Sequence, residues 1–309
     1  MLGQHPQMYG LPEMHLFVCN TMQQWWPMFK AGRTPAAHGI LRAVSQINWG
    51  DQTNATIELS RIWLLRRRQY DIASVYKELA ECVYPLSIVE KSPSTVYRLE
   101  YMQRALRTFP NAKFLHLLRH PSGYGRSLLN ALEEFHNAGF MKRTISDFMI
   151  NQQLRKNEGS EFNAGPSLVD KDKGLFDFNT DPPTFDPQGR WFDLHSNICR
   201  FLRTLPRDQW MRTRGEDLIA DPDDHLREIS DWMGLRTDPE AIEAMKHPER
   251  SPFACLGPSN AQLGNDLGFL ENPHFRIGNW PRSAPRRYRS KPKRIEGKRS
   301  RCQEPLRPV

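Results

Sequence analysis

The chain has 309 residues, of which 39% are hydrophobic and 25% charged, the composition of an ordinary globular protein. This length allows one large domain or two small ones, and no apolar run approaches the roughly 20 residues that a membrane span needs. The net charge of +8 arises at one end, because residues 282–309 hold eleven Arg or Lys and two Glu. The body is therefore close to neutral, which gives no reason to expect a nucleic-acid partner.

Cysteine usage and the start of the sequence both favour a reducing compartment. Met1–Pro6 has neither the basic nor the apolar region of a signal peptide, so we expect a cytoplasmic protein. The cysteines are odd in number and lack CxxC spacing, so we expect neither a disulfide framework nor a bound metal. The five cysteines are Cys19, Cys82, Cys199, Cys255 and Cys302.

Residues 1–17 indicate the end of a helix, a turn and a short extended piece. The turn holds Gly10-Leu11-Pro12-Glu13, and His15 lies two positions beyond Glu13. A carboxylate within reach of a hydroxyl can remove its proton, which makes Glu13 a candidate general base. The alternative is that Glu13 faces solvent and His15 packs locally.

Residues 20–82 have helical patterns without a strand. Arg66-Arg67-Arg68 indicates a solvated helix face, with a substrate-facing basic patch as the alternative. Because this segment follows Glu13 directly, we expect the molecule that reacts at Glu13 to be recognised here.

A first strand–turn–helix unit follows. Residues 86–89 indicate a short strand, Glu90-Lys91-Ser92-Pro93 a turn, and residues 95–108 a helix. This places the cation of Lys91 at the carboxyl end of the strand. The alternative is a surface arrangement of Lys91 with Glu90.

A second unit has the same order. An apolar run over 112–118 ends at Arg119, Pro121 stops the strand, and Ser122 is expected to cap the next helix. If the two strands are parallel neighbours, Lys91 and Arg119 lie at the same sheet edge, where open α/β sheets bind ligands. Arg119, the free N–H groups of the helix and the Ser127 hydroxyl would suit a phosphate, although an ordinary strand–helix junction fits as well.

Beyond the second unit, residues 144–158 indicate a helix. Residues 159–189 are rich in Gly, Pro, Asp and Asn, as expected of a long loop or insertion. An apolar stripe over 191–205 then predicts a helix.

Residues 210–214 indicate a strand that leads into Gly215-Glu216-Asp217-Leu218, and a helix follows that ends near Gly234. We expect Glu216 and Asp217 to have a structural role, through capping and pairing across the sheet.

The end of the body, residues 274–280, places Arg276 and Gly278 before Trp280, a spacing that also fits a surface turn. Residues 281–309 have no periodicity and are dense in Arg and Lys, so we expect a disordered tail. The expected organisation is thus a body over 1–280, with the 159–189 insertion, and a basic tail over 281–309.

Taken in order, these motifs resemble the bacterial type of sulfotransferase that uses 3′-phosphoadenosine 5′-phosphosulfate (PAPS). The likeness covers roughly residues 1–280. Its motifs are Gly-Leu-Pro-Glu, Glu-Lys-Ser-Pro, Arg-x-Pro with a Ser eight positions beyond the Arg, Arg-x-Glu-Asp-Leu, and Gly-x-Trp. The resemblance implies an α/β fold like that of P-loop transferases, with a parallel sheet and helices on both faces. The Gly- and Ser/Thr-rich loop with which the family cradles the 5′ phosphosulfate is not found, so we expect the first strand and loop to be missing.

The resemblance also implies roles for the candidate residues. The reaction would be transfer of a sulfonate from PAPS to a hydroxyl or amine by in-line displacement, with release of 3′-phosphoadenosine 5′-phosphate (PAP) and without a metal. Glu13 would be the base with His15 beside it, and Lys91 would stabilise charge on the transferring group. The acceptor would be a small molecule, a sugar or a peptide. The donor's 3′-phosphate would be bound by Arg119, Ser127, Arg276, Gly278 and Trp280.

Other functions fit some of the same features. A chain without the 5′ loop would bind PAP without turnover. A nucleic-acid-binding protein would act through the basic tail, although the body has no recognition motif. A nucleotide kinase would need a Walker-type loop, and the sequence has none.

Overall fold

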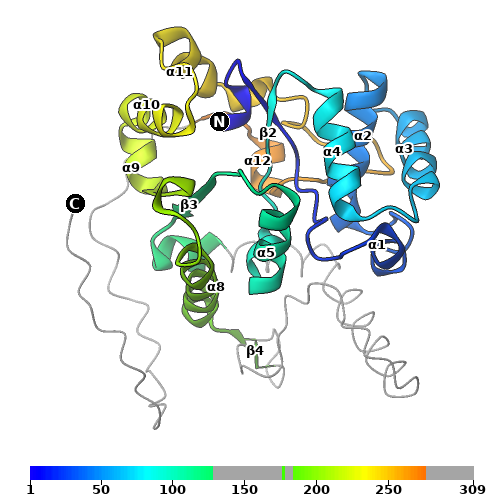
Figure 1. Cartoon of the computed structure of the whole chain (residues 1–309), viewed down its shortest axis with the longest axis horizontal. Coiled ribbons are helices and arrows are strands. Elements are labelled where there is room, and N and C mark those ends of the chain that lie inside the picture. The colour runs from blue at the N-terminus through cyan, green and yellow to red at the C-terminus, as the bar shows by residue number, and fades with distance from the viewer. Residues whose placement is uncertain (128–175, 178–183, 276–309) are drawn as a thin grey trace. The chain divides into compact units, whose positions relative to one another are not determined.

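The computed structural model of the chain describes residues 1–127, 176–177 and 184–275, which belong to one unit spanning Met1–Asn279 (Figure 1). The predicted helix 144–158, most of the 159–189 insertion and the tail lie outside the described residues. So do three predicted donor-binding residues: Arg276, Gly278 and Trp280.

Two pairs of parallel strands carry the motifs found in the sequence. The first pair is β1 (Met8–Gly10) with β2 (Ser87–Val89), and Tyr9 lies opposite Ile88. The second pair is β3 (Phe114–Leu118) with β6 (Trp210–Arg214), and His116 lies opposite Arg212. We expected β2 and β3 to be neighbours, but within the described part of the chain each pairs with another strand. A short antiparallel pair, β4 (Phe176–Asp177) with β5 (Thr184–Phe185), falls inside the predicted insertion.

Helices make up most of the remaining regular structure of the described chain, and residues 121–127 are helical as well. The helical segment expected over 20–82 is confirmed, as are helices after β2, before β6 and after β6. The α-helices are α1 (Met22–Met28), α2 (His38–Trp49), α3 (Asn54–Arg66), α4 (Ile72–Cys82), α5 (Leu99–Thr108), α8 (Pro187–Leu202), α9 (Gly215–Ala220), α10 (Pro222–Met233), α11 (Pro239–Met245) and α12 (Leu267–Glu271). The 3₁₀-helices are η1 (Leu2–Gln4), η2 (Pro35–Ala37), η3 (Pro93–Val96), η5 (Arg207–Gln209) and η6 (Pro248–Arg250).

Local sequence explains where the main helices begin and end. The Thr53 and Asp71 side chains cap α3 and α4 by accepting hydrogen bonds from free N–H groups of the first turn. Asp186 caps α8 in the same way, and Pro187 takes the first helical position, where its missing N–H costs nothing. Gly234 ends α10 with φ of 75°, a left-handed conformation that glycine adopts without strain.

The core has three clusters, and they place helices on both faces of the β3–β6 pair. The largest gathers α1–α4 around the segment 11–19. Phe114 and Trp210, which are register partners, pack into a second cluster with α5 and α8. Leu115 and Met211, one position further along each strand, pack into the third with α9, α10 and α11. Successive strand residues point to opposite faces, so this alternation packs both sides of the pair against helices.

Candidate functional site

Glu13 and Lys91 meet beyond the carboxyl ends of β1 and β2. The strands are parallel and in register, so the segments that follow Gly10 and Val89 leave from the same edge. The Lys91 ammonium donates a hydrogen bond to Glu13 Oε1 and forms an ion pair with it. The structure thus brings together two of the predicted catalytic residues, which are 78 positions apart in sequence.

His15 completes this group on the other side of the carboxylate. Its Nε2 lies 3.5 Å from Glu13 Oε2, and its Nδ1 lies 2.7 Å from the Ser94 hydroxyl. The side chain of Glu13 is 14% exposed, and burial alone would raise its pKa. The hydrogen bond with His15 and the positive charge of Lys91 outweigh burial, so the pKa of Glu13 is lowered overall. Glu13 is therefore ionised at neutral pH.

A buried hydrogen-bond network holds the backbone of this segment. The Ser92 hydroxyl donates to Glu90 Oε1 and accepts from the His15 N–H at 2.9 Å. The Met14 N–H donates to the same Glu90 oxygen at 3.3 Å. His15 has φ of 51°, an unfavourable conformation for a residue with a Cβ. The network keeps His15 in this conformation beside Glu13, as strained residues at functional sites are commonly held.

Close backbone contacts also hold the main chain of Glu13. The Glu13 N–H donates to the Gly264 carbonyl at 2.7 Å. A Cβ on Gly39, near the start of α2, would lie 2.0 Å from the Glu13 carbonyl oxygen. Only glycine permits this approach, so α2 supports the main chain of the candidate base directly.

The segment after β3, which we call the second part of the candidate site, carries two of the predicted donor-binding residues. Arg119 and Ser127 are both exposed, with Ser127 in the helical stretch 121–127. Ser122 was predicted to cap this helix, but the helix begins at Pro121, and the Ser122 N–H donates to His120 Nδ1 at 3.2 Å. Proline has no N–H to donate and suits the first helical position, which moves the cap two residues earlier, to His120.

Hydrogen bonds from β6–α9 and from α8 hold the Arg119 turn. Glu216 Oε1 accepts from the His120 N–H at 2.7 Å, so this residue of the Arg-x-Glu-Asp-Leu motif supports the turn. Trp191 Nε1 on α8 donates to the Arg119 carbonyl at 2.9 Å. Asn197, further along α8, donates to the Tyr97 carbonyl at 3.1 Å. Helix α8 therefore ties the turn after β3 to the segment that follows Lys91.

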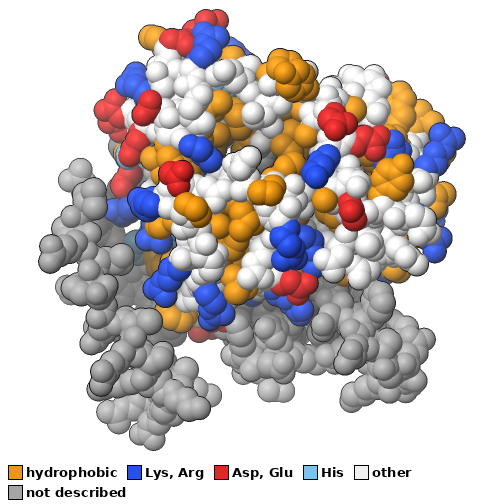
Figure 2. Space-filling model, viewed as in Figure 1, with side chains coloured by type: hydrophobic (Ala, Val, Ile, Leu, Met, Phe, Trp, Pro, Cys, Tyr) orange, Lys and Arg blue, Asp and Glu red, His pale blue; other side chains and the backbone are white. Residues whose placement is uncertain are grey.

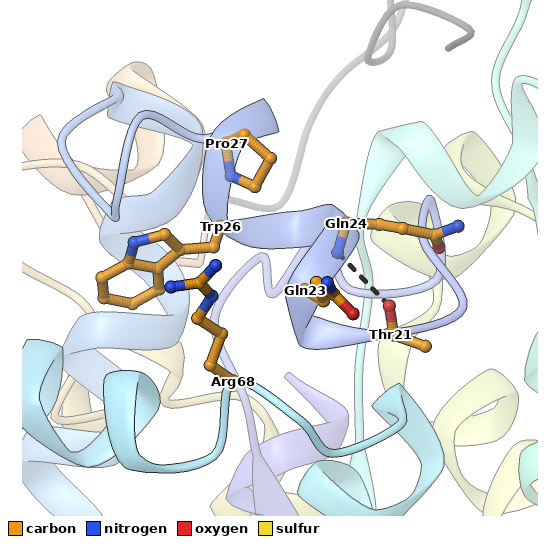
Figure 3. Close-up of a pocket in the computed structure, with 6 residues that line it drawn as sticks. All are labelled: Thr21, Gln23, Gln24, Trp26, Pro27 and Arg68. Atoms are coloured by element: carbon orange, nitrogen blue, oxygen red, sulfur yellow. Dashed lines mark hydrogen bonds between the residues drawn. The ribbon is translucent and has the colours of Figure 1, made fainter. Parts of the chain in front are cut away.

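A surface hollow of about 640 Å³ lies elsewhere, between α1 and the end of α3 (Figure 3). In Figure 3, the Arg68 side chain reaches toward the Trp26 ring. None of the predicted catalytic or donor-binding residues lines the hollow. Its lining consists of Thr21, Gln23, Gln24, Trp26, Pro27 and Arg68. Acidic and basic side chains both occur across the face shown in Figure 2, with hydrophobic ones between them.

Two residues of the site region were not singled out in the sequence. Tyr97 follows η3, and Arg190 lies in the first turn of α8. Arg190 has a signal in the sequence: it precedes Leu194, Asn197 and Phe201 at helical spacing, so it lies on the packed face of α8. No group of three His, Cys, Asp or Glu in the described ranges is placed to hold a metal ion. Within the same ranges no helix has the length and hydropathy to cross a bilayer.

The comparisons with known proteins agree with this architecture. The model of a sulfotransferase family matches residues 1–160. The sulfotransferase domain from the curacin biosynthetic pathway is similar in structure, with a TM-score of 0.58 and 20% identity over 90% of this chain and 81% of that one. The sulfotransferase domain from the Synechococcus PCC 7002 olefin synthase has a TM-score of 0.57 and 21% identity over 89% of this chain and 78% of that one. No curated protein matches the chain.

Proposed function

The chain belongs to the sulfotransferase family, and we propose that it transfers a sulfonate from PAPS to a hydroxyl or amine acceptor. The observation that carries the proposal is the contact of Glu13 with both Lys91 and His15 beyond two parallel strands. A partly buried, ionised carboxylate beside an exposed cation provides a base and a charge stabiliser in one place. The class of acceptor, a small molecule, a sugar or a peptide, is part of the proposal.

In the proposed reaction, the acceptor oxygen or nitrogen attacks the sulfur of PAPS as Glu13 takes the acceptor's proton. The bond between sulfur and the bridging phosphate oxygen breaks, and PAP leaves with the electron pair. Positioning and charge stabilisation supply most of the catalysis in the analogous phosphoryl transfers. The geometry suits this division of work, because the ionised Glu13 is ready to accept a proton.

Lys91 is suited to follow the developing charge. Its side chain is 67% exposed and contacts Glu13 only at the end of a flexible stem. In the proposal it turns from Glu13 to the sulfonate or the leaving phosphate when the donor binds. Glu13 then loses a partner that lowers its pKa and becomes a stronger base.

Donor binding is assigned to the second part of the site. We propose that Arg119 forms a bidentate contact with the 3′-phosphate and that the Ser127 hydroxyl donates to it. The exposure of both side chains supports this role, since each can reach a ligand. We assign the remaining contacts to Arg276, Gly278 and Trp280, which lie outside the described residues.

The test is release of PAP from PAPS in the presence of a panel of sugar, amine and phenol acceptors. The Glu13→Gln variant is compared with Glu81→Gln, a matched change at an exposed glutamate of α4. Loss of a general base lowers kcat/KM by ~10²–10⁴-fold, whereas the control should equal the wild type. Equal rates for both variants would contradict the role of Glu13. PAP binding without any turnover by the wild type would instead support the non-catalytic alternative.

A further inference from the structure

Three arginines are buried in the described part of the chain, and they differ in what surrounds them. Arg42 donates to the Gln52 side chain and to the Leu263 carbonyl, and its remaining nitrogen contacts the Cys255 sulfur. These partners satisfy the guanidinium within the protein.

Arg104 on α5 is 6% exposed and is satisfied as fully. Its Nε donates to Asn20, its Nη1 to the Phe17 carbonyl, and its Nη2 to Glu100. It joins α5 to the segment that follows His15, which is a structural role.

Arg190 on α8 is the exception. It is 8% exposed, and its guanidinium carbon lies 4.6 Å from the centre of the Tyr97 ring. Its Nη2 is buried and has no hydrogen-bond partner in the structure. None of the described carboxylates lies within ion-pair distance of it, in contrast to Arg104 with Glu100.

A guanidinium stays charged at every relevant pH, so burial does not neutralise it. A buried charge without a partner is strongly unfavourable, and the face of an aromatic ring compensates only part of the lost hydration. Such an arrangement is stabilised when an anion completes it, because the two forked nitrogens fit the oxygens of a phosphate or sulfonate.

The surroundings of Arg190 place such an anion near the proposed reaction centre. Burial raises the pKa of both Tyr97 and Tyr124, and the Arg190 charge acts on both hydroxyls in the opposite direction. Tyr97 also experiences a hydrogen bond from Arg190 and the charge of Glu13, so it lies near both the guanidinium and the base. Both tyrosines are partly exposed, so the group reaches the surface.

We propose that Arg190, with Tyr97 and Tyr124, binds an oxyanion of a substrate: a phosphate or sulfonate group carried by the donor or by the acceptor. The assignment to a substrate rests on the proposed function. The anion site itself does not, since any small tetrahedral oxyanion would occupy it.

The experiment measures thermal unfolding of the full chain with millimolar sodium sulfate and with sodium chloride of equal ionic strength. Sulfate should raise the Tm of the wild type by about 2–4 °C, because an anion that binds only the folded state stabilises it. Arg190→Met removes the charged guanidinium and keeps an unbranched apolar stem. It should abolish the sulfate effect and leave the Tm in chloride equal to or above that of the wild type.

Two matched variants make the result specific. Arg104→Met should lower the Tm in both salts and keep the sulfate effect. Arg190→Lys keeps a positive charge without the forked guanidinium, so it should retain part of the sulfate effect. This variant also replaces Arg190→Met in the test if Arg190→Met fails to fold. A sulfate effect that persists in Arg190→Met, or is fully kept in a destabilised Arg190→Lys, would overturn the proposal.

Titration with PAP shows whether the anion belongs to the donor or to the acceptor. It also tests the proposed function separately from the anion site at Arg190. A donor group at Arg190 predicts ~10–100-fold weaker PAP binding by Arg190→Met, and an acceptor group predicts unchanged PAP binding with a raised acceptor KM. If PAP does not bind the wild type but Arg190→Met still loses the sulfate effect, the proposed function fails and the anion site stands. If PAP binds the wild type and the sulfate effect persists in Arg190→Met, the anion site at Arg190 fails and the proposed function stands.

Discussion

The region around Arg104 and the region around Arg190 both bury a guanidinium, but they complete its hydrogen bonds differently. Arg104 donates from each nitrogen to an acceptor: two acceptors lie in the segment that follows His15, and the third is the Glu100 carboxylate on its own helix. Arg190 finds an aromatic ring and leaves Nη2 without a partner. The first arrangement joins parts of the fold, and the second leaves a place for a ligand.

The charged residues of the candidate active site also differ in how firmly their partners are held. Glu13 is compensated from both sides, by Lys91 and by His15. Its carboxylate is therefore stable in the empty protein, at the expense of basicity. Lys91 is the partner that can leave, because it is exposed whereas His15 is held by Ser94. Under the proposed function, this pairing is the resting state, and binding of the substrates frees Glu13 to act as the base.

The largest effect should come from breaking the structural arginine. Arg104→Met leaves the buried Phe17 carbonyl and the Asn20 side chain without their donor, so we expect the free energy of unfolding to fall by about 3 kcal/mol. Chemical denaturation of this variant beside Arg190→Met checks the contrast. Equal losses of stability in the two variants would remove the distinction between the regions.

The stability of the fold should depend on pH through two histidines that meet where α8 packs against β3 and β6. His116 Nε2 lies 2.8 Å from His195 Nδ1, and Arg212 Nε lies 3.2 Å from His116 Nδ1. Burial, then the nearby His195 and Arg212, lower the pKa of His116 to about 3. Burial, then Arg212, also lower the pKa of His195.

These two histidines should destabilise the fold in acid. Below about pH 6.5 the unfolded chain takes up protons that the folded chain refuses until about pH 3, so stability falls as the pH drops through this window. The double variant His116→Asn, His195→Asn should show a flatter dependence of Tm on pH. His225→Gln, at a more exposed histidine of α10, is the control and should keep the wild-type slope. If the Tm of the double variant depended on pH as steeply as that of the wild type, His116 and His195 would not govern acid stability.

A smaller effect is expected at the partner of the base. Lys91→Met should lower kcat/KM by ~10–100-fold, as expected for one charge-stabilising contact. It should also move the acidic limb of kcat/KM to higher pH, because Glu13 loses a cation that lowers its pKa. Lys77→Met, at an exposed lysine of α4, is the matched control. A reduced rate without a shift of the limb would assign Lys91 to catalysis but not to the pKa of Glu13.

The smallest effect should come from the support of the Arg119 turn. Glu216→Ala removes the acceptor of the His120 N–H, so PAP binding should weaken by ~5-fold while stability changes by about 1 kcal/mol or less. Asp217→Ala removes only an exposed contact with Arg214 at 3.6 Å, and should leave PAP binding unchanged. Calorimetric titration of both variants is the check, and equal affinities would rule out the proposed support.

Much of the local structure could be predicted from the sequence. Hydrophobic periodicity gave the strands near Ile88, Leu115 and Thr213, and the apolar stripe after residue 190 gave α8. These predictions depend on neighbours in sequence, where spacing and side-chain pattern act directly. Glu13 and Lys91 were identified by motif, and their contact is confirmed.

The sequence did not predict which strands pair or how many hydrogen-bond partners a buried side chain finds. Nothing in the strand near Ile88 specifies that it pairs with the strand near Tyr9 rather than with the one near Leu115, because short apolar strands are interchangeable in composition. The environment of Arg190, in which Nη2 has no partner, depends on segments from Tyr97 and Tyr124 that meet only in the fold. The contact of Gly39 with Glu13 is a backbone approach that no side-chain pattern reveals.

The proposed donor site is tested by calorimetric titration of PAP into the wild type and into Arg119→Ala. The proposed function predicts saturable binding by the wild type and ~10–100-fold weaker binding by the variant, because a bidentate contact with the 3′-phosphate is lost. Far-UV circular dichroism of both proteins confirms that the fold is unchanged. Absence of binding by the wild type, or equal affinity in the two proteins, would contradict the donor site proposed here.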